Sequence, residues 1–359
     1  MNNISNKNSL QQDLKELSVF LGSNLDWVQG AGGNTSVKDD GTLWVKASGY
    51  WLSDAQNNDI FTPLDRRAVL GKITQGEEDL ASAQVSKEKY QSLRPSIETT
   101  MHALMRHKFV AHVHSVNVIS YSILTNGKDL ISERLGSINW LWVPYVRPGL
   151  PLTKMLNAMK VADFDVLILA NHGVVIGGET KDEVLSILAQ VEKKLFRPVR
   201  TDLIDADKIK LKSLVENIEY KLPKYDLCHS LAKDNLSLKI IGKNPLYPDH
   251  VIFLGPGTVP MMSLEEFSDK ASSTSFNYKV VVIKDIGVVV HQDLSENAEE
   301  MLHCLTSVLL RLQPNDKLQH LTQSEEAELL GWDAEKYRKS IQRQGYANSN
   351  TNVRVWRAV

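Results

Sequence analysis

Cysteine is scarce in this chain, the charges nearly cancel, and long hydrophobic runs are missing. The 359 residues include only two cysteines, Cys228 and Cys304. Two are too few for a disulfide framework, and their spacing is not that of a zinc ribbon, so we expect both to be reduced and mostly buried. The 41 basic and 43 acidic side chains leave no electrostatic footprint for nucleic acid or an anionic membrane surface.

Apolar runs are short throughout the sequence. None approaches the length of a membrane-spanning helix, and the first eight residues contain no apolar segment typical of a signal peptide. We therefore expect a cytoplasmic protein without a membrane or nucleic-acid partner. The balance of 42% hydrophobic and 23% charged residues is that of a globular protein, and the length allows two domains with a substantial core each.

The sequence does contain regular elements joined by glycine-rich turns. Apolar residues recur at helical spacing over residues 10–21 and predict an opening amphipathic helix. Gly30–Val37 follows and leads into a predicted β-hairpin with its turn at Asp39–Gly41. Glycines let backbone N–H groups approach a ligand. Gly30–Val37 therefore either holds an anion, helped by Asn34, Thr35 and Ser36, or is a flexible lead-in to the hairpin.

Two short polar motifs come next. Ala47–Gly49 is a small-residue turn that could add the Ser48 hydroxyl and an N–H group to the same anion pocket. Arg94–Ser96 indicates a helix start, with Glu98 in the first turn. The helix dipole also favours a carboxylate there, so Glu98 is either a capping residue or a functional one. Neither motif identifies a site by itself.

Histidines give the first chemical signal. His112 and His114 lie two residues apart in an apolar run, and in an extended strand both point to one face, where they can chelate one divalent ion. Chance also places two of ten histidines this close, so a third ligand must decide. His172 supplies it, because it follows the buried strand predicted at Phe164–Ala170 and precedes Gly173, which permits close approach in a cleft.

The second part of the chain resembles a segment of the first. Residues 281–311 align with residues 167–197 and retain the glycine, the valine-rich strand, the acidic helix start and the terminal arginine. Ile286 stands where His172 stands. We interpret the two segments as a duplication, although two unrelated strand–turn–strand–helix units would look similar. The predicted domains are a metal-binding catalytic domain over residues 1–215 and a degenerate scaffold without metal ligands over residues 216–359, whose tail includes short helices at 321–327 and 331–338.

Five of these motifs occur in an order and spacing that resembles the class II aldolase/adducin family: Gly33–Ser36, Ser48–Gly49, Ser96 with Glu98, His112 with His114, and Asn171–Gly173. The resemblance covers residues 10–200 directly. It is closest to the aldolase portion of bifunctional rhamnulose-phosphate aldolase/short-chain dehydrogenase proteins, through Arg94–Glu98, Val143–Gly149 and the degenerate second half. We expect no dehydrogenase portion, because no Gly-x-Gly-x-x-Gly follows a predicted strand.

This resemblance implies an α/β fold, a three-layer α/β/α domain with a mainly antiparallel central sheet, plus a degenerate second α/β half. It implies that His112, His114 and His172 hold a divalent metal ion, for which zinc is expected. It also implies that Glu98 shuttles a proton and ligates the metal when no substrate is bound. Three imidazoles with an open position are independently typical of a catalytic zinc site. The substrate-binding positions of the family correspond to Asn34, Thr35, Ser48, Gly49 and Ser96.

Two departures from the family pattern matter. Some phosphate-using members have consecutive serines before the catalytic glutamate, whereas Ile97 precedes Glu98 in this chain. The lost hydroxyl weakens the case for a phosphorylated substrate. In relatives, a tyrosine from a neighbouring subunit protonates the leaving fragment. Tyr145 is our candidate for that acid, and a tyrosine in an interface core is the alternative.

The function implied by the resemblance is that of a lyase of carbohydrate metabolism. As a class II aldolase, or aldehyde-lyase, it would cleave a ketose or ketose phosphate reversibly through a metal-stabilised enediolate. A sugar-phosphate epimerase or a keto-acid decarboxylase of the same family would share these ligands. A non-catalytic adducin-like assembly module is a third possibility, although such a module would not need the metal ligands and Glu98. The implied partners are a small-molecule sugar or sugar phosphate and further copies of the chain, in a homo-oligomer such as a tetramer.

Overall fold

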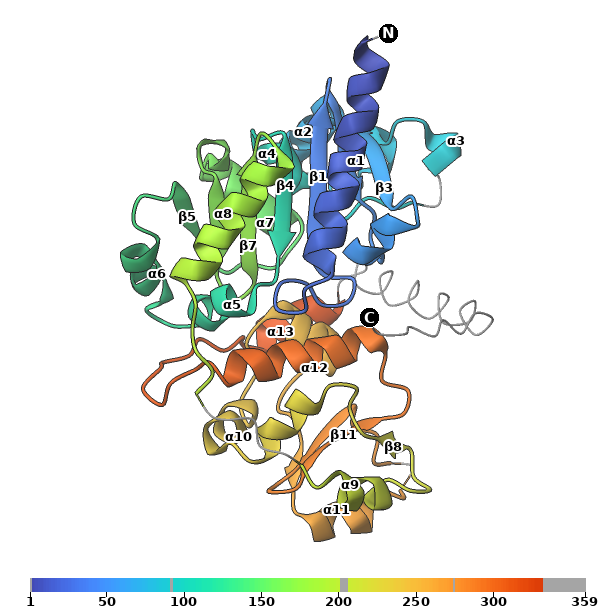
Figure 1. Ribbon diagram of the computed structural model, residues 1–359, viewed down its shortest axis with the longest axis vertical. Helices are drawn as coiled ribbons and strands as arrows, with labels where there is room; N and C mark the ends of the chain where they lie inside the picture. Colours follow the sequence, from blue (N-terminus) through green and yellow to red (C-terminus); the bar gives the residue numbers. More distant parts are fainter. Residues whose placement is uncertain (1, 91–92, 201–205, 274, 332–359) are drawn as a thin grey trace.

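The computed structural model describes residues 2–90, 93–200, 206–273 and 275–331. The helix predicted at residues 331–338 falls outside this part of the chain except for its first residue. Two α/β halves are stacked along the long axis of the molecule, with the N-terminal half at the top of Figure 1 and the C-terminal half below it. Each half is built around its own β-sheet.

A seven-stranded sheet forms the centre of the N-terminal half, in the order β3-β2-β1-β4-β7-β6-β5. All neighbouring strands are antiparallel except β5 and β6. The predicted mainly antiparallel sheet is therefore confirmed. The strands are β1 (Asn34–Asp39), β2 (Thr42–Lys46), β3 (Phe61–Asp65), β4 (Phe109–Val113), β5 (Trp140–Val143), β6 (Val166–Leu169) and β7 (Gly173–Gly178).

Helices cover both faces of this sheet, which gives the predicted three layers (Figure 1). On one face, α1 (Asn2–Gly22) and α8 (Lys181–Lys194) pack against Ala111 and Val113 of β4. On the other, α4 (Thr99–Leu104) and α7 (Leu150–Ala158) pack against Val110. Because side chains alternate along a strand, His112 faces the side of α4. The remaining elements are η1 (Leu52–Gln56), α2 (Arg66–Gln75), η2 (Ala81–Ala83), α3 (Lys87–Tyr90), α5 (Val116–Ser122), α6 (Gly127–Leu135) and η3 (Val161–Asp163).

The C-terminal half contains a smaller four-stranded sheet in the order β8-β11-β10-β9. Its strands are β8 (Tyr220–Lys221), β9 (Met261–Met262), β10 (Val280–Ile283) and β11 (Gly287–His291). Its helices are α9 (Lys208–Leu214), η4 (Asp226–Ala232), α10 (Asn235–Ile241), the π-helix η5 (His250–Leu254), α11 (Leu264–Lys270), α12 (Glu296–Leu309) and α13 (Gln323–Gly331).

The segments β6–β7–α8 and β10–β11–α12 have the same order of elements. Asn171 and Asp285 occupy matching positions in the two hairpin turns, and both have positive φ angles, 53° and 61°. Left-handed backbone at a residue other than glycine is uncommon, so the shared conformation supports the interpretation of a duplication. Ile286, which replaces His172, packs against an apolar cluster of the C-terminal half.

One hydrophobic core runs through both halves. It includes Val118 of α5, Leu188 of α8 and Leu305 of α12. Helix α12 lies across the junction between the two halves and contacts α5 (Figure 1). The predicted division at residue 215 therefore separates two sheets that share this core, and each half also has smaller buried clusters of its own.

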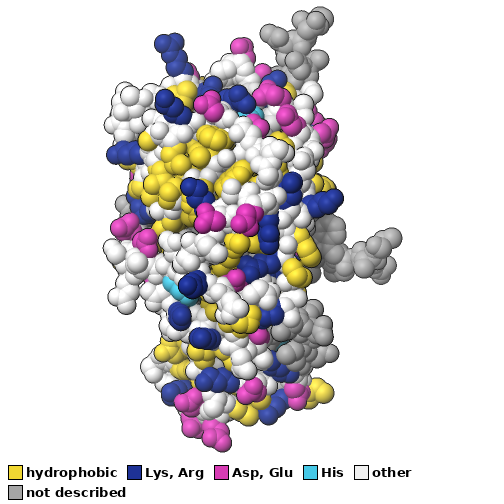
Figure 2. All heavy atoms as spheres, turned by 90° about the vertical axis from the view of Figure 1, so that its left-hand side faces the viewer, with side chains coloured by type: hydrophobic (Ala, Val, Ile, Leu, Met, Phe, Trp, Pro, Cys, Tyr) yellow, Lys and Arg dark blue, Asp and Glu magenta, His cyan; other side chains and the backbone are white. Residues whose placement is uncertain are grey.

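The surface shows no segregation of charge on the face drawn in Figure 2, where basic and acidic side chains are interspersed among hydrophobic ones. This matches the near-zero net charge of the sequence. Within the described ranges, no helix is both long and apolar enough to cross a membrane.

Candidate metal centre

Three histidines from two neighbouring elements meet near the end of the central sheet. His112 lies in β4, His114 lies just beyond its end, and His172 lies in the turn between β6 and β7. One ring nitrogen from each lies within 4.8 Å of the others. Gly173 makes this possible, because a Cβ atom there would lie 2.5 Å from the Val113 carbonyl oxygen of β4. The predicted triad is thus brought together.

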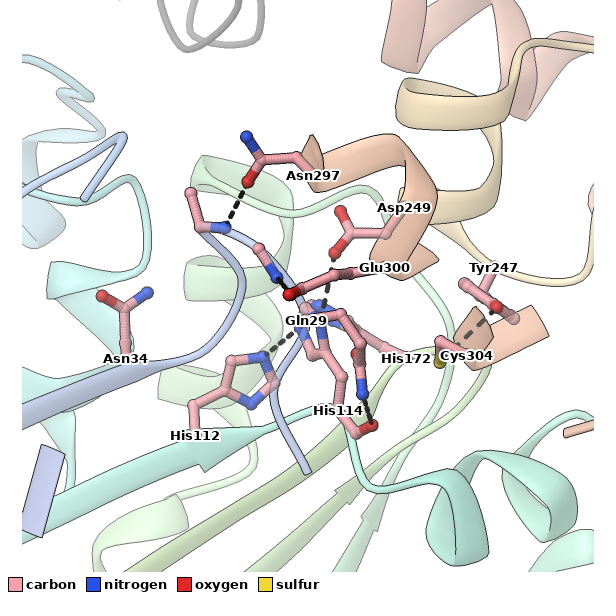
Figure 3. Close-up of polar contacts among 12 residues, drawn as sticks. Gln29, Asn34, His112, His114, His172, Tyr247, Asp249, Asn297, Glu300 and Cys304 are labelled. Atoms are coloured by element: carbon pink, nitrogen blue, oxygen red, sulfur yellow. Dashed lines mark hydrogen bonds and ion pairs between the residues drawn. The ribbon is translucent and has the colours of Figure 1, made fainter. Parts of the chain in front are cut away.

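The groups that face the outer ring nitrogens favour one tautomer of each ring. His112 Nδ1 lies 3.1 Å from the Val174 carbonyl oxygen. His114 Nδ1 lies 3.1 Å from Asp249 Oδ2, an ion-pair contact drawn in Figure 3. Both oxygens can only accept, so they favour the tautomers that carry the proton on Nδ1. The Nε2 atoms of His112 and His114, 3.1 Å apart, then present lone pairs to each other. A bound cation would satisfy that arrangement, and the donor set therefore fits a divalent metal.

Burial disfavours the charged form of two of these imidazoles, those of His112 and His172. The side chain of His112 is fully buried and that of His172 is 11% exposed. Burial lowers the pKa of His112, and it lowers the pKa of His172 to about 3, with the neighbouring rings of His112 and His114 adding to the effect. Metal binding requires the neutral form, which burial thus favours at His112 and His172.

Glu98 points into the same cluster. Its Oε1 atom lies 3.5 Å from His112 Nε2 and 3.7 Å from His172 Nε2. Burial opposes its ionisation, but the three histidines and the Asn34 amide outweigh burial and hold the pKa of Glu98 at about 2. Glu98 is the N-cap residue of α4, yet its side chain makes no capping hydrogen bond. Its carboxylate is directed to the histidines and not to the helix.

The polar motifs of the sequence form one wall of the cavity beside the histidines. An isolated β-bridge between Ala47 and Pro95 joins their two segments, and the Ser48 N–H donates to the Arg94 carbonyl oxygen at 2.9 Å. This pairing places Ser48, Gly49 and Ser96 together among the lining residues. Asn34, in the strand beside His112, donates to Ser96 Oγ at 2.9 Å and to Glu98 Oε2 at 2.7 Å.

The sequence left the glycine-rich segment as either an anion cradle or a lead-in to the hairpin. The N–H groups of Gly30 and Ala31 donate to Glu300 Oε2 and Asn297 Oδ1 of α12, both at 2.6 Å (Figure 3). The Gly32 N–H donates to the carbonyl oxygen of Gln29, the residue before the segment, at 2.9 Å. These three backbone donors are therefore used inside the protein, which favours the alternative of a lead-in to the hairpin for this part of the segment.

Glycine is needed in this segment for close packing. Gly33 has a φ angle of 64°, and a Cβ atom there would lie 2.9 Å from the His112 carbonyl oxygen. The small residues thus let the segment run directly over the histidine strand.

Two predicted residues do not reach the cavity within one chain. Thr35 points to the opposite face of β1, where its hydroxyl lies 2.6 Å from Ser18 Oγ of α1. Tyr145 is absent from the lining residues, and its hydroxyl is buried without a hydrogen-bond partner among the described residues. Burial raises the pKa of Tyr145, and the carboxylates of Glu325 and Glu328 in α13 raise it further.

Sequence reasoning missed several residues of the cavity. Lys46 is buried at the end of β2, where its Nζ donates to the carbonyl oxygens of Ala31 and Tyr50 at 2.9 and 2.7 Å. The C-terminal half contributes Pro248, Asp249 and Ile252. No local pattern marks these residues, because they reach the histidines only through contacts distant in the sequence. The C-terminal half, which we expected to be a scaffold, thus also lines the cavity.

The fold and the site together define the class of protein: it has a three-layer α/β domain with a buried histidine triad. A family model described as the Class II Aldolase and Adducin N-terminal domain matches residues 13–195. The match covers half of the chain, and the protein belongs to this family.

Three curated relatives share this region. The uncharacterized oxidoreductase YuxG of Bacillus subtilis is 31% identical over 204 residues, which cover 51% of this chain but 29% of that protein. The L-fuculose phosphate aldolase of Methanococcus vannielii is 27% identical, with 50% of this chain and 94% of the relative covered. The 3-oxo-tetronate 4-phosphate decarboxylase of Escherichia coli O6:H1 is also 27% identical, with 53% and 92% covered.

Proposed function

We propose that the protein is a metal-dependent aldehyde-lyase that cleaves a ketose or ketose phosphate. The observation that carries this proposal is the convergence of three buried histidine rings with the Glu98 carboxylate, beside a cavity that His114, His172 and Glu98 line. In this proposal His112, His114 and His172 hold the metal, and Glu98 adds a ligand when no substrate is bound. Class II aldolases are metal-dependent, and zinc is the metal that a set of histidine ligands with an open position favours.

The bound metal would supply Lewis-acid chemistry by stabilising negative charge on the oxygens of the substrate. The chain itself would move the proton. A Glu98 carboxylate with a pKa of about 2 is ionised at neutral pH and suited to act as a base. It would take a proton from carbon in the condensation direction and return it in cleavage. Tyr145 would act as the acid for the leaving fragment in the site of a neighbouring subunit, within a homo-oligomer such as a tetramer.

The substrate would be oriented by the polar wall of the cavity. Ser48, Gly49 and Ser96 offer donors for a phosphate or a terminal hydroxyl, and Lys46 adds a buried cation nearby. Asn34 already donates to Ser96 and Glu98, so it would offer its Oδ1 acceptor to a substrate hydroxyl. A phosphate at this wall would gain charge-assisted hydrogen bonds. Ile97, which lines the same cavity, supplies no hydroxyl. A role of Thr35 would have to be indirect, through the position of β1.

The experiment combines metal analysis with a lyase assay on the full chain. Purified protein should contain about one equivalent of a divalent metal, and it should release an aldehyde from one or more members of a panel of ketoses and ketose phosphates. His172→Ala should lose both the metal and the activity. Metal-free wild-type protein, together with unchanged activity in His172→Ala, would refute the proposal.

A second candidate is decarboxylation of a keto acid phosphate. It is favoured by the similarity to the decarboxylase from Escherichia coli, and the same histidines and Glu98 would serve it. Epimerisation of a sugar phosphate would use the same groups, whereas an assembly module would need none of them. Product analysis separates the enzymes, because only decarboxylation releases carbon dioxide and only epimerisation conserves the carbon skeleton.

The wider setting is part of the same proposal. We infer that the chain corresponds to the aldolase portion of rhamnulose-phosphate aldolase/dehydrogenase proteins, with a catalytic domain over residues 1–215 and a degenerate domain over residues 216–359. The shared order of β6–β7–α8 and β10–β11–α12 supports this division. A cytoplasmic location is supported by the free thiols of Cys228 and Cys304.

A further inference from the structure

The residue on the far side of the His114 ring comes from the C-terminal half. Asp249 Oδ2 lies 3.1 Å from His114 Nδ1, while His114 Nε2 meets His112 on the other side of the ring (Figure 3). The side chains of His114 and Asp249 are only 7% and 8% exposed. The family domain ends at residue 195, so this carboxylate lies outside it.

Asp249 is held in place by the turn that carries the third histidine. Asn171, which precedes His172, donates from Nδ2 to the Leu246 carbonyl oxygen at 2.8 Å. The Leu246 N–H in turn donates to His250 Nδ1 at 3.4 Å. Asp249 is the residue before the π-helix η5. The turn between β6 and β7 thus positions both a ligand of the cluster and the segment that carries Asp249.

The chemistry of this contact bears on the metal centre. A carboxylate has only acceptor atoms at neutral pH, so it selects the His114 tautomer with the proton on Nδ1. The lone pair of Nε2 is then free to face the cluster. A carboxylate behind an imidazole also fixes the ring and increases its strength as a metal ligand. Val174 serves His112 in the same way, but through an uncharged carbonyl group.

We propose that Asp249 is a positioning residue of the metal centre, which orients His114 and strengthens its hold on a divalent cation. The C-terminal half then completes the site that the family domain begins. This inference rests on the proposed metal centre at His112, His114 and His172. It does not depend on which reaction the centre catalyses.

The test uses the full chain with Co²⁺ as the probe. Affinity is measured by competition with a chromophoric chelator, and coordination by the visible absorption spectrum. Asp249→Ala should lower the affinity by about 10- to 100-fold and change the absorption band, because His114 loses its fixed tautomer. Asp249→Asn keeps an acceptor oxygen without the charge and should recover part of the affinity. Circular dichroism tests whether each variant is folded. If Asp249→Ala does not fold, the affinity of Asp249→Asn tests the role of Asp249.

The matched control is Asp316→Asn. Asp316 also belongs to the C-terminal half and pairs with Arg197 of the N-terminal half, but it does not line the cavity. We expect wild-type affinity and an unchanged spectrum for this variant. Wild-type Co²⁺ affinity in folded Asp249 variants would overturn the role of Asp249 and leave the metal centre intact. An equal loss of affinity in Asp316→Asn would show that Asp249 acts only by holding the two halves together. A wild-type chain that binds no Co²⁺ would overturn the metal centre itself.

Discussion

Glu98 occupies the N-cap of α4, where a carboxylate commonly accepts a hydrogen bond from the first turn of the helix. Its side chain instead accepts from Asn34 and lies against His112 and His172. The buried carboxylate is kept ionised by the histidines and by this one amide donor. The sequence left capping and function as alternatives for Glu98, and the direction of its side chain favours function.

Replacing Glu98 with glutamine should separate metal binding from catalysis. Glu98→Gln keeps the shape of the side chain but cannot take up the proton, so we expect kcat to fall by about 10²- to 10⁴-fold. The three histidines should still retain the metal. Activity assays combined with metal analysis check this expectation. The control is Glu78→Gln, because the side chain of Glu78 is 46% exposed at the surface. A kcat within a few-fold of wild type would remove Glu98 from the mechanism.

Substitution of Ser48 tests whether the polar wall of the cavity binds a phosphate. Ser48→Ala removes one hydroxyl donor, and a hydrogen bond to a charged group contributes about 1.5–3 kcal/mol. We expect KM for a ketose phosphate to rise by about 10- to 100-fold, with little change in KM for the unphosphorylated ketose. Steady-state kinetics on such a matched pair of substrates measures the difference. An equal effect on both substrates would indicate that this wall binds a neutral hydroxyl.

At the scale of residues, local patterns predicted the histidine triad, and the resemblance to the family placed Glu98 beside it. The spacing of two in a strand and the abrupt end of a buried strand are local features, and both held in the structure. Strand alternation could also have placed Thr35 on the face opposite Asn34. Asp249 could not be predicted, because its contact with His114 joins segments far apart in the chain that share no motif.

Helix α12 explains why the glycine-rich segment is not a free anion site. Asn297 and Glu300 lie one turn apart on α12, and both accept N–H groups of the segment. The backbone of Gly30 and Ala31 is therefore fixed by the C-terminal half. The segment in turn passes over His114, since a Cβ atom on Gly32 would lie 3.0 Å from His114 Nδ1. Glycine content alone could not distinguish a segment bound to α12 from a phosphate-binding loop, because the hydrogen-bond acceptors come from a helix distant in the sequence.

The π-helix η5 should give the protein a measurable dependence on pH. Burial, together with a smaller effect of His320, lowers the pKa of His250 to about 3. An unfolded histidine has a pKa near 6.5, so the unfolded chain binds a proton that the folded chain excludes between pH 6.5 and 3. This histidine therefore makes the free energy of unfolding fall as the pH drops through that window, by up to about 1.4 kcal/mol per pH unit.

Urea unfolding of wild type and His250→Asn between pH 6.5 and 5 checks this expectation. The free energy of unfolding of the variant should fall less steeply as the pH drops, with a slope that differs from wild type by up to one proton. A constant destabilisation caused by the substitution does not change this slope. Other buried histidines steepen both curves, as at His102, where burial lowers the pKa to about 3. Only the difference in slope is therefore informative. Parallel curves would show that His250 does not titrate between the two states.

At the scale of elements, the predicted hairpin was confirmed, because its turn residues are a local signal. The apolar run that holds His112 and His114 was harder. Its strand ends at Val113, and Ser115 accepts a hydrogen bond from the Val118 N–H and starts α5. A continuous apolar run hides such a change, since both elements are buried and share the same residue types.

The whole molecule is held together across its two sheets. The shared hydrophobic core joins α5 of the N-terminal half to α12 of the C-terminal half. Ion pairs reinforce the junction, with Arg197 facing Asp316 and Arg200 facing Asp234. Because the histidine cluster lies next to this junction and takes Asp249 across it, separate unfolding of the C-terminal half would open the metal centre.

Leu305→Ala tests this coupling. Leu305 is fully buried in α12, and such a substitution costs about 2–5 kcal/mol. Both cysteines lie in the C-terminal half and are buried, so their reactivity with a thiol reagent reports on that half. Tryptophan fluorescence reports mainly on the N-terminal half, which holds five of the seven tryptophans. We expect the two probes to give one coincident urea transition in wild type, shifted equally for both probes in Leu305→Ala. Thiols that react at lower urea than the fluorescence change would show that the halves unfold independently, and the C-terminal half would then be an appended domain and not an integral part of the metal centre.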